Sequence, residues 1–315
     1  MDLDPLRAME EWHGFFTTAQ AHDVGYSDRA IGREVRYGRW HRFRRGYFVF
    51  RDTWADLDDV GRHRVLSLAV LHSHGSVVAL SHVSGAVAHD VAVWGHDLSR
   101  VHVTRLDGGA GRIEGDVVHH EGVCVDGDVR EVGGSLVLRP ERCVLEAGSR
   151  ADGAARLVPL DSLLARGLAT HDALLSQFAA MERWPFMQSM QVPVRLADGG
   201  AQSPGETLGR YLFWAAHLPR PETQFEVHDA EGTLLGTCDW AWPEHGLLGE
   251  FDGRIKYGRL VKPGLEPGDV VFAEKQREDL LRETTGFGMV RLVWDDLDRP
   301  RLTAARVRRG LRMAS

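Results

Sequence analysis

Cysteine is scarce in this sequence, with three residues in 315, and none of them forms a CxxC motif. This pattern excludes a disulfide-stabilised scaffold and a zinc ribbon, and it favours a reducing, cytoplasmic location. No apolar run approaches the ~20 residues that span a bilayer, and the first residues lack the pattern of a signal peptide, so we expect no membrane partner. The formal net charge is −7, which excludes a uniformly basic nucleic-acid coat.

An arginine-rich segment near the N-terminus reverses this charge balance locally, with eight arginines and one glutamate between residues 29 and 51. Glycine breakers and cap residues predict helices over 3–12, 17–24 and 28–37, followed by a two-stranded ribbon that turns near Arg45-Gly46. This order is typical of a winged helix-turn-helix that binds DNA phosphates, and the alternative is a solvated basic surface on a structural domain. The candidate DNA-binding residues are Arg29, Arg33, Arg36, Arg39, Arg42, Arg44 and Arg45.

The middle of the chain carries no motif with obvious chemistry. Its pattern predicts helices over 56–74 and 81–94, short strands between 101 and 138, and helices over 140–185. Its histidines show neither an HExxH motif nor a zinc-finger spacing, so we interpret them as scattered surface and core residues. A Gly-rich linker at 196–205 precedes the last third. The predicted fold class is therefore a multidomain α+β or α/β protein with domains 1–55, 56–195 and 196–315.

A predicted hairpin in the last third brings carboxylates together. A four-residue loop at 243–246 joins two apolar runs, and its register places Asp239 directly opposite Glu250, with Asp252 on the same face. Carboxylates at this spacing repel each other unless a cation or a proton lies between them, and oxygen-only ligands suit Mg²⁺ or Mn²⁺. The alternative is a coincidental set of acids on an exposed strand, because a one-residue shift in register separates Asp239 from Glu250.

The C-terminal segments SPGETLGRYLFWAAHLPRPETQFEV, GTCDWAWPEHGLLGEFDG and EKQREDLLRETTGFGMVRLVW resemble the Vsr-like branch of the PD-(D/E)XK nuclease superfamily. The resemblance covers about residues 203–297 and implies an α/β domain with a central mixed sheet. It also implies that Glu206, Asp239 and Glu250 bind a catalytic Mg²⁺ ion. The alternative is that Glu206 has only a structural role, because it forms a capping box with Ser203 at the start of a helix.

The resemblance departs from the family pattern at the catalytic lysine, since Asp252 stands where that pattern more often has lysine. Only three of the 38 basic residues are lysines, and all three lie between residues 256 and 275, a grouping that points to a site requiring an ammonium group. Lys256 and Lys275 are therefore the candidates for the catalytic lysine, and Asp252 is a candidate further ligand.

The N-terminal segment FFTTAQAHDVGYSDRAIGREVRYGRWHRFRRGYFVF resembles the winged helix-turn-helix of AbiEi-type antitoxins, which bind and repress their own promoters in type IV toxin–antitoxin systems. Two hypotheses follow. The first is a Mg²⁺-dependent deoxyribonuclease that binds double-stranded DNA through its N-terminal domain. The second is an antitoxin-type transcriptional regulator with an inactive nuclease-like domain and a cognate toxin as partner. A protein-interaction adaptor is a third hypothesis, and the basic N-terminal segment makes it the weakest.

Overall fold

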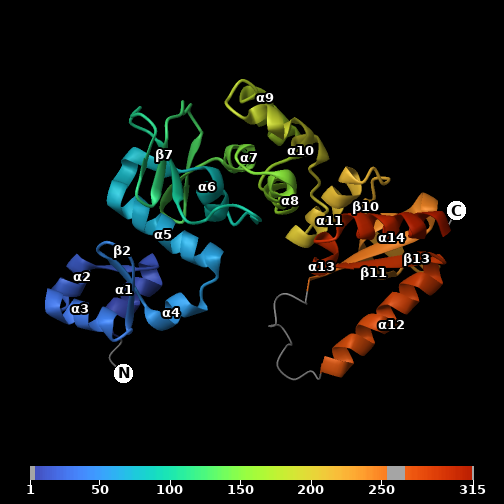
Figure 1. Cartoon of the computed structure of the whole chain (residues 1–315), viewed down its shortest axis with the longest axis horizontal. Coiled ribbons are helices and arrows are strands. Elements are labelled where there is room, and N and C mark those ends of the chain that lie inside the picture. Colours follow the sequence, from blue (N-terminus) through green and yellow to red (C-terminus); the bar gives the residue numbers. More distant parts are fainter. Residues whose placement is uncertain (1–3, 254–266, 314–315) are drawn as a thin grey trace. The chain divides into compact units, whose positions relative to one another are not determined.

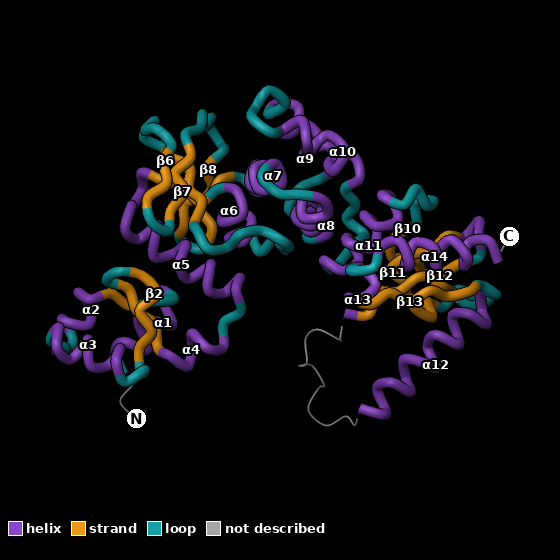
Figure 2. Tube along the Cα trace, viewed as in Figure 1, coloured by secondary structure: helices purple, strands orange, loops and turns teal. Residues whose placement is uncertain are grey.

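The computed structural model describes residues 4–253 and 267–313 (Figures 1 and 2). The chain divides into two compact units. The first unit comprises Met1–Pro159 and Ala169–Val194, and the second comprises Leu160–Leu168 and Arg195–Ser315. Both units mix helices with sheets, as the sequence predicts. No helix among the described residues is long and apolar enough to cross a membrane.

The N-terminal part of the first unit combines short helices with a small antiparallel sheet of strand order β1-β3-β2. Ser27 caps α3, the helix predicted over 28–37, because its hydroxyl accepts a hydrogen bond from the Ala30 amide. The ribbon turns at Arg45-Gly46, where Gly46 has a φ of +80° that favours glycine. The elements are α1 (Pro5–His13), β1 (Phe16–Thr17), α2 (Thr18–Asp23), α3 (Asp28–Arg36), β2 (Trp40–Arg44) and β3 (Tyr47–Phe50).

The following segment is built on a six-stranded sheet with strand order β6-β7-β5-β4-β9-β8. The β5–β7 and β4–β9 pairs are parallel and the other pairs are antiparallel. The elements are α4 (Arg51–Asp56), α5 (Asp59–His74), η1 (Gly75–Val77), β4 (Val78–Leu80), α6 (His82–Ala88), β5 (Val101–Arg105), β6 (Arg112–Glu114), β7 (Val117–His120), β8 (Val129–Val132), β9 (Ser135–Leu138), α7 (Pro140–Ser149), η2 (Gly153–Arg156), α8 (Leu157–Ala165), α9 (His171–Ala180), η3 (Met187–Met190) and α10 (Gln191–Leu196).

Two expectations for this region were wrong in detail. The sequence predicts a helix over 81–94, but α6 ends at Ala88, because the chain reverses at Asp90, whose φ is +59°. The sequence pattern also missed β4, a three-residue strand that is buried along its whole length. A short apolar run of this kind carries no periodicity that separates a central strand from a helix.

The second unit has the order helix, three strands, helix and strand, with two further helices after them. Its sheet has the order β10-β11-β12-β13, and it is mixed, because β12 and β13 are parallel while the other pairs are antiparallel. The elements are α11 (Pro204–Ala215), β10 (Glu222–His228), β11 (Leu234–Trp242), η4 (Pro243–His245), β12 (Leu247–Asp252), α12 (Pro267–Thr285), β13 (Gly288–Val293), α13 (Trp294–Leu297) and α14 (Pro300–Met313).

Two glycines allow α11 to lie close to this sheet. A Cβ atom on Gly205 would lie 1.9 Å from the Phe251 ring, and one on Gly209 would lie 2.4 Å from the Trp240 indole. Trp240 is fully buried in the core of the unit, so it has little room to move. The close approach fixes the position of the first turn of α11, which carries Glu206.

Replacing Gly209 with alanine is expected to lower the free energy of unfolding by about 1–3 kcal/mol, because the added methyl group overlaps the Trp240 indole. The matched control is Gly32→Ala, also within a helix, where the new Cβ meets nothing within 4 Å. That change is expected to stabilise the protein by up to about 1 kcal/mol through helix propensity. Urea unfolding followed by circular dichroism distinguishes the two, and equal effects of both changes would contradict the packing argument.

Candidate functional site

The hairpin of β11 and β12 has the register that the sequence predicts. Trp240 pairs with Gly249, Ala241 with Leu248 and Trp242 with Leu247. Continuing this register by one residue places Asp239 opposite Glu250. The amide of Phe251 donates a hydrogen bond of 2.7 Å to Asp239 Oδ2, so the carboxyl of Asp239 is directed toward β12.

On the other side of Asp239 lies Gln224, a residue that was not predicted as part of the site. Thr223 pairs with Trp240 and Phe225 with Cys238, so Gln224 of β10 stands opposite Asp239. Its φ is +50°, an uncommon conformation for a residue other than glycine and one that is often found at functional sites. No signal in the sequence marks Gln224 beyond its place in a predicted strand, because only the pairing of β10 with β11 brings it to the site.

Glu206 reaches the same site from the first turn of α11. It is only 7% exposed, and its Oε2 accepts hydrogen bonds from the Gln202 amide at 2.9 Å and from Gln224 Nε2 at 3.3 Å. Ser203 caps the helix by accepting from the Glu206 amide, and its hydroxyl donates to Glu206 Oε1. The capping role predicted for Ser203 is therefore present, and it accounts for one of the two carboxylate oxygens of Glu206.

Burial raises the pKa values of both carboxyls. For Asp239 burial is the main cause, the negative charge of Glu206 adds to it, and the pKa rises to about 6. The pKa of Glu206 is raised by burial and is held back by hydrogen bonds from Ser203, Gln202 and Gln224. A desolvated carboxyl whose ionised form is disfavoured by a second carboxylate is a common feature of binding and catalytic sites.

Glu250 is half-buried and lies between two arginines. Its Oε1 accepts from Arg277 of α12 at 2.9 Å, and its Oε2 accepts from Arg291 of β13 at 3.2 Å. Burial still raises the pKa of Glu250, although both guanidinium groups act in the opposite direction. Arg291 also binds Glu278, so the cation is shared between two acids. Arg291 was not predicted as a site residue.

The remaining predicted site residues are described only in part. Asp252 is the last residue of β12, half-buried, two positions beyond Glu250. Lys256 lies outside the described residues. Lys275 is in α12, and its side chain also lies outside the described part of the structure. Within the described residues, Glu206, Asp239 and Glu250 do not form a group of three ligands whose oxygens all lie within 4.8 Å of one another.

The seven predicted DNA-binding arginines fall into two groups. Two of them are bound within the protein: Arg39 pairs with Glu34 of α3, and Arg44 is half-buried and donates to Asp116 Oδ2 at 3.0 Å and Ser73 Oγ at 2.6 Å. Arg44 therefore does not extend from the ribbon as the alternation in the sequence predicted, because β2 has an irregular register between Arg42 and Arg44. The other five arginines are exposed or half-exposed, namely Arg29, Arg33, Arg36, Arg42 and Arg45.

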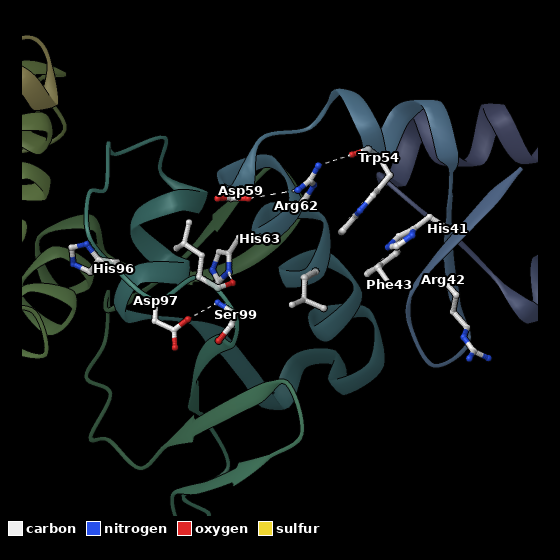
Figure 3. A pocket seen from close by; sticks show the side chains of 12 residues that line it. His41, Arg42, Phe43, Trp54, Asp59, Arg62, His63, His96, Asp97 and Ser99 are labelled. Carbon is white, nitrogen blue, oxygen red and sulfur yellow. Dashed lines mark hydrogen bonds and ion pairs between the residues drawn. The ribbon is translucent and has the colours of Figure 1, made fainter. Parts of the chain in front are cut away.

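A cavity of about 530 Å³ lies beside β2 in the first unit (Figure 3). His41 stacks on the indole of Trp54, with ring centroids 4.5 Å apart, and the Arg62 guanidinium lies 5.5 Å from the centroid of the same ring. Burial, followed by the charges of Arg51 and Arg62, lowers the pKa of His41. The cavity therefore combines an aromatic wall with guanidinium groups.

No protein-family model matches this sequence. Two relatives from Mycobacterium tuberculosis, the uncharacterized proteins MT2308 and Rv2248, are each 26% identical to it over 184 residues. The match covers 58% of this chain and 64% of each relative, so it spans less than two thirds of their length. Neither name carries a function that bears on the carboxylate cluster or on the arginines.

Proposed function

We propose that this chain is a DNA-binding protein whose second unit hydrolyses DNA phosphodiester bonds with the help of Mg²⁺ or Mn²⁺. The observation that carries the proposal is the setting of Asp239, whose pKa is raised to about 6 by burial and by Glu206. A carboxyl of this kind destabilises the fold at neutral pH unless a cation is bound, so its presence is best explained by a binding function.

The donor set suits a hard divalent cation. Glu206 and Asp239 offer carboxylate oxygens beside the amide of Gln224, and no nitrogen or sulfur ligand of zinc type is part of this described cluster. Bound there, Mg²⁺ would supply Lewis-acid polarisation of a phosphate and lower the pKa of a water. Arg277 and Arg291 hold Glu250 in place and lie where a phosphate charge can be offset.

Binding to duplex DNA is supported by the arginines of the N-terminal segment. Arg29, Arg33 and Arg36 occupy α3 at helical spacings of four and three, which places them on one side of the helix. Arg42 and Arg45 lie on the neighbouring ribbon and reach solvent. Such a local basic surface binds phosphates even when the net charge of the whole chain is negative.

A second candidate function is an antitoxin-type transcriptional repressor with an inactive nuclease-like unit and a toxin as partner. The observation that favours it is the pairing of Glu250 with Arg277 and Arg291, which already satisfies the charge that a metal ion would otherwise balance. Asp252, which stands where the nucleases that this unit resembles more often have lysine, favours it as well.

Replacing Arg33 and Arg36 together with alanine is expected to weaken binding to duplex DNA by at least about tenfold, because two phosphate contacts are lost. The salt dependence of binding is expected to flatten by about two in the slope of log K against log salt. The matched control replaces Arg64 and Arg112 with alanine. Both residues lie outside the N-terminal segment, so this variant loses the same amount of charge and is expected to bind DNA nearly as the wild-type chain does. Fluorescence anisotropy at several salt concentrations measures both, and equal effects would contradict DNA binding through α3.

Plasmid cleavage in Mg²⁺ or Mn²⁺ separates the two candidate functions. If the protein is a nuclease, the wild-type chain is expected to cleave the plasmid and the Glu250→Ala variant is expected not to. The control variant Glu244→Ala, in the loop of the same hairpin, is expected to retain cleavage. No cleavage by the wild-type chain, with duplex binding intact, would instead support the repressor.

A further inference from the structure

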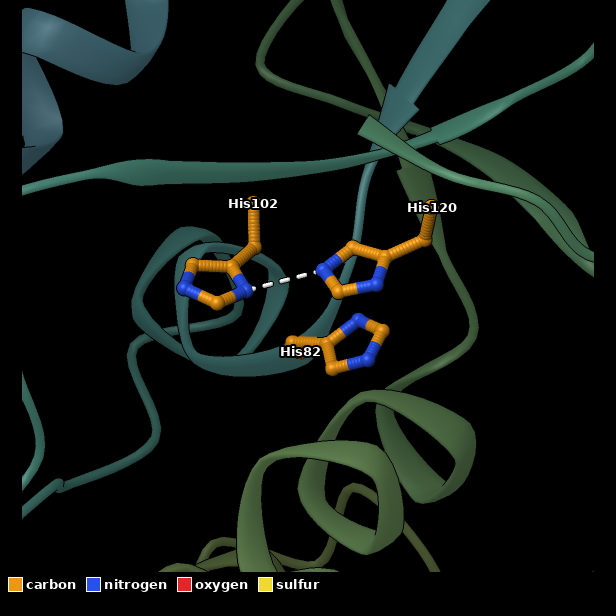
Figure 4. Close-up of side chains that lie close together, drawn as sticks. All are labelled: His82, His102 and His120. Atoms are coloured by element: carbon orange, nitrogen blue, oxygen red, sulfur yellow. Dashed lines mark hydrogen bonds between the residues drawn. The ribbon is translucent and has the colours of Figure 1, made fainter. Parts of the chain in front are cut away.

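Three histidines converge on one face of the six-stranded sheet in the first unit (Figure 4). His102 lies on β5 and His120 on the parallel strand β7, where the pairing of His102 with Val118 puts both histidines on the same face. His82 begins α6, directly after β4. One nitrogen from each ring lies within 4.8 Å of the other two, and no other group of His, Cys, Asp or Glu among the described residues meets this distance.

The rings are close enough to share an ion. His102 Nδ1 and His120 Nε2 are 2.9 Å apart, and the ring centroids of His82 and His120 are separated by 3.6 Å. Two imidazole nitrogens bound tetrahedrally to zinc at about 2.0–2.1 Å lie about 3.3 Å apart. The separation of the His102 and His120 nitrogens is therefore close to that of two zinc ligands, and all three ligand nitrogens lie within 4.8 Å of one another.

The surroundings of His82 resemble the second layer of a metal site. Its Nδ1 lies 3.3 Å from Glu146 Oε2 and 3.0 Å from Ser81 Oγ. A carboxylate beside a ligating histidine orients the ring and raises its basicity. Glu146 is itself held by the Arg142 guanidinium at 2.8 Å. The backbone of His82 has a φ of +50°, a conformation that costs energy and that the surrounding contacts maintain.

Burial disfavours the charged form of all three rings. Burial lowers the pKa of His102 to about 4 and that of His120 to about 3, and it lowers the pKa of His82 strongly as well. A neutral imidazole has one nitrogen lone pair, and the hydrogen bond between His102 Nδ1 and His120 Nε2 uses one of these lone pairs, which an ion bound there would take instead. Three polar rings brought together in a buried region carry a desolvation cost that an ion bound by all three would offset.

We propose that His82, His102 and His120 bind a Zn²⁺ ion, with a fourth coordination position open to water. Imidazole nitrogen is a preferred zinc ligand, whereas Mg²⁺ and Mn²⁺ prefer oxygen, so this site is chemically distinct from the carboxylate cluster of the second unit. Glu146 acts on the site through His82 as a positioning residue. The proposal is independent of whether the second unit cleaves DNA.

The test measures zinc binding by the full chain. The chain is first treated with a chelator to remove bound metal, and it then competes with a chromophoric indicator for added Zn²⁺ in the presence of excess Mg²⁺. One Zn²⁺ per chain is expected to bind, and His102→Gln with His120→Gln is expected to weaken binding at least about 100-fold. The matched control, His72→Gln with His228→Gln, removes two exposed histidines outside the cluster and is expected to bind like the wild-type chain. Asp239→Asn is also expected to bind zinc normally.

A second measurement uses the wild-type chain alone, with Co²⁺ in place of Zn²⁺. The wild-type chain with Co²⁺ is expected to give the intense visible absorption of four-coordinate cobalt, without the near-ultraviolet band of thiolate ligands. Absence of stoichiometric zinc binding, a weak octahedral cobalt spectrum, or equal affinity in the folded histidine double variant would each overturn the proposal. Circular dichroism establishes whether that variant is folded, and the cobalt spectrum decides the question if it is not.

Discussion

Asp239→Asn is expected to reduce Mg²⁺-dependent cleavage of duplex DNA by at least about 100-fold and, in the same variant, to increase stability at pH 8. Cleavage falls because an amide is a poor ligand for a hard cation and cannot offset its charge, and metal-ion stabilisation of the transition state amounts to several kcal/mol. Stability rises because the ionised carboxyl of Asp239 is buried beside Glu206. Loss of activity with a gain in stability is typical of a residue retained for function.

The pH dependence of this gain has a definite sign. Asp239 ionises near pH 3.8 in an unfolded chain and near about 6 in the folded protein, so the folded state holds the proton more tightly. The carboxyl therefore contributes stability below pH 4, and this contribution is lost as the pH rises through about 6. The full shift corresponds to about 3 kcal/mol, which partial exposure reduces to about 1–2 kcal/mol.

Urea unfolding of the wild-type chain and of Asp239→Asn at pH 4 and pH 8 measures the effect. The variant is expected to be more stable at pH 8 and equal to the wild type at pH 4. Addition of Mg²⁺ is expected to raise the melting temperature of the wild-type chain at pH 8 and to leave that of the variant unchanged. A variant that is less stable than the wild type at pH 8 would show that Asp239 has a structural role and would remove the main support for the proposed cation site.

Arg142→Leu is expected to lower the free energy of unfolding by about 3–5 kcal/mol, which is a large effect for a single substitution. Arg142 is only 1% exposed, and it donates to Glu146 and Asp128, both at 2.8 Å, and to the Val123 carbonyl at 3.0 Å. Leucine fills part of the same space but leaves the buried Glu146 carboxylate without its guanidinium partner, whereas Asp128 keeps Arg139 at 3.1 Å. The cost comes mainly from the unpaired charge of Glu146, whose pKa is raised by burial, and it is smaller at low pH, where this carboxyl is protonated.

Arg112→Leu is the control, because Arg112 forms an exposed ion pair with Glu114 in the same unit. It is expected to leave the urea midpoint nearly unchanged, since exposed pairs contribute little. Measuring both variants at pH 5 and pH 8 tests the mechanism: the deficit of Arg142→Leu should shrink at pH 5. A deficit independent of pH would mean that lost packing, and not charge, dominates.

Local signals in the sequence were enough to predict several features of the fold. Ser27 and Ser203 cap helices where predicted, because an N-cap requires only the chemistry of a few consecutive residues. The loop at 243–246 fixed the register of its hairpin, because loop length determines which residues pair across a short turn. The mixed sheet of the second unit was an implication of the resemblance to a nuclease superfamily, and the structure has such a sheet. The DNA-binding and nuclease functions stay predictions.

Other features depend on contacts between distant segments. In the sequence, Arg44 belongs to a segment in which arginines alternate with aromatic residues, and this pattern predicts an exposed arginine. In the fold, Arg44 instead donates a hydrogen bond to Asp116, 72 residues away. Gln224 becomes part of the carboxylate site only when β10 pairs with β11. These pairings depend on the packing of whole elements, which local periodicity does not encode.

The helix caps, the hairpin register and the concentration of arginine near the N-terminus could be read from the chain alone, because each depends on residues close together in it. Which side chains share a site became clear only from the folded arrangement. His82, His102 and His120 have no metal-binding spacing and were interpreted as scattered residues, but parallel pairing of β5 with β7 and the start of α6 bring them within 4.8 Å. Ligand spacing in a sequence reveals a metal site only when its ligands come from one local motif, and a sheet assembles sites from strands that are remote in the chain.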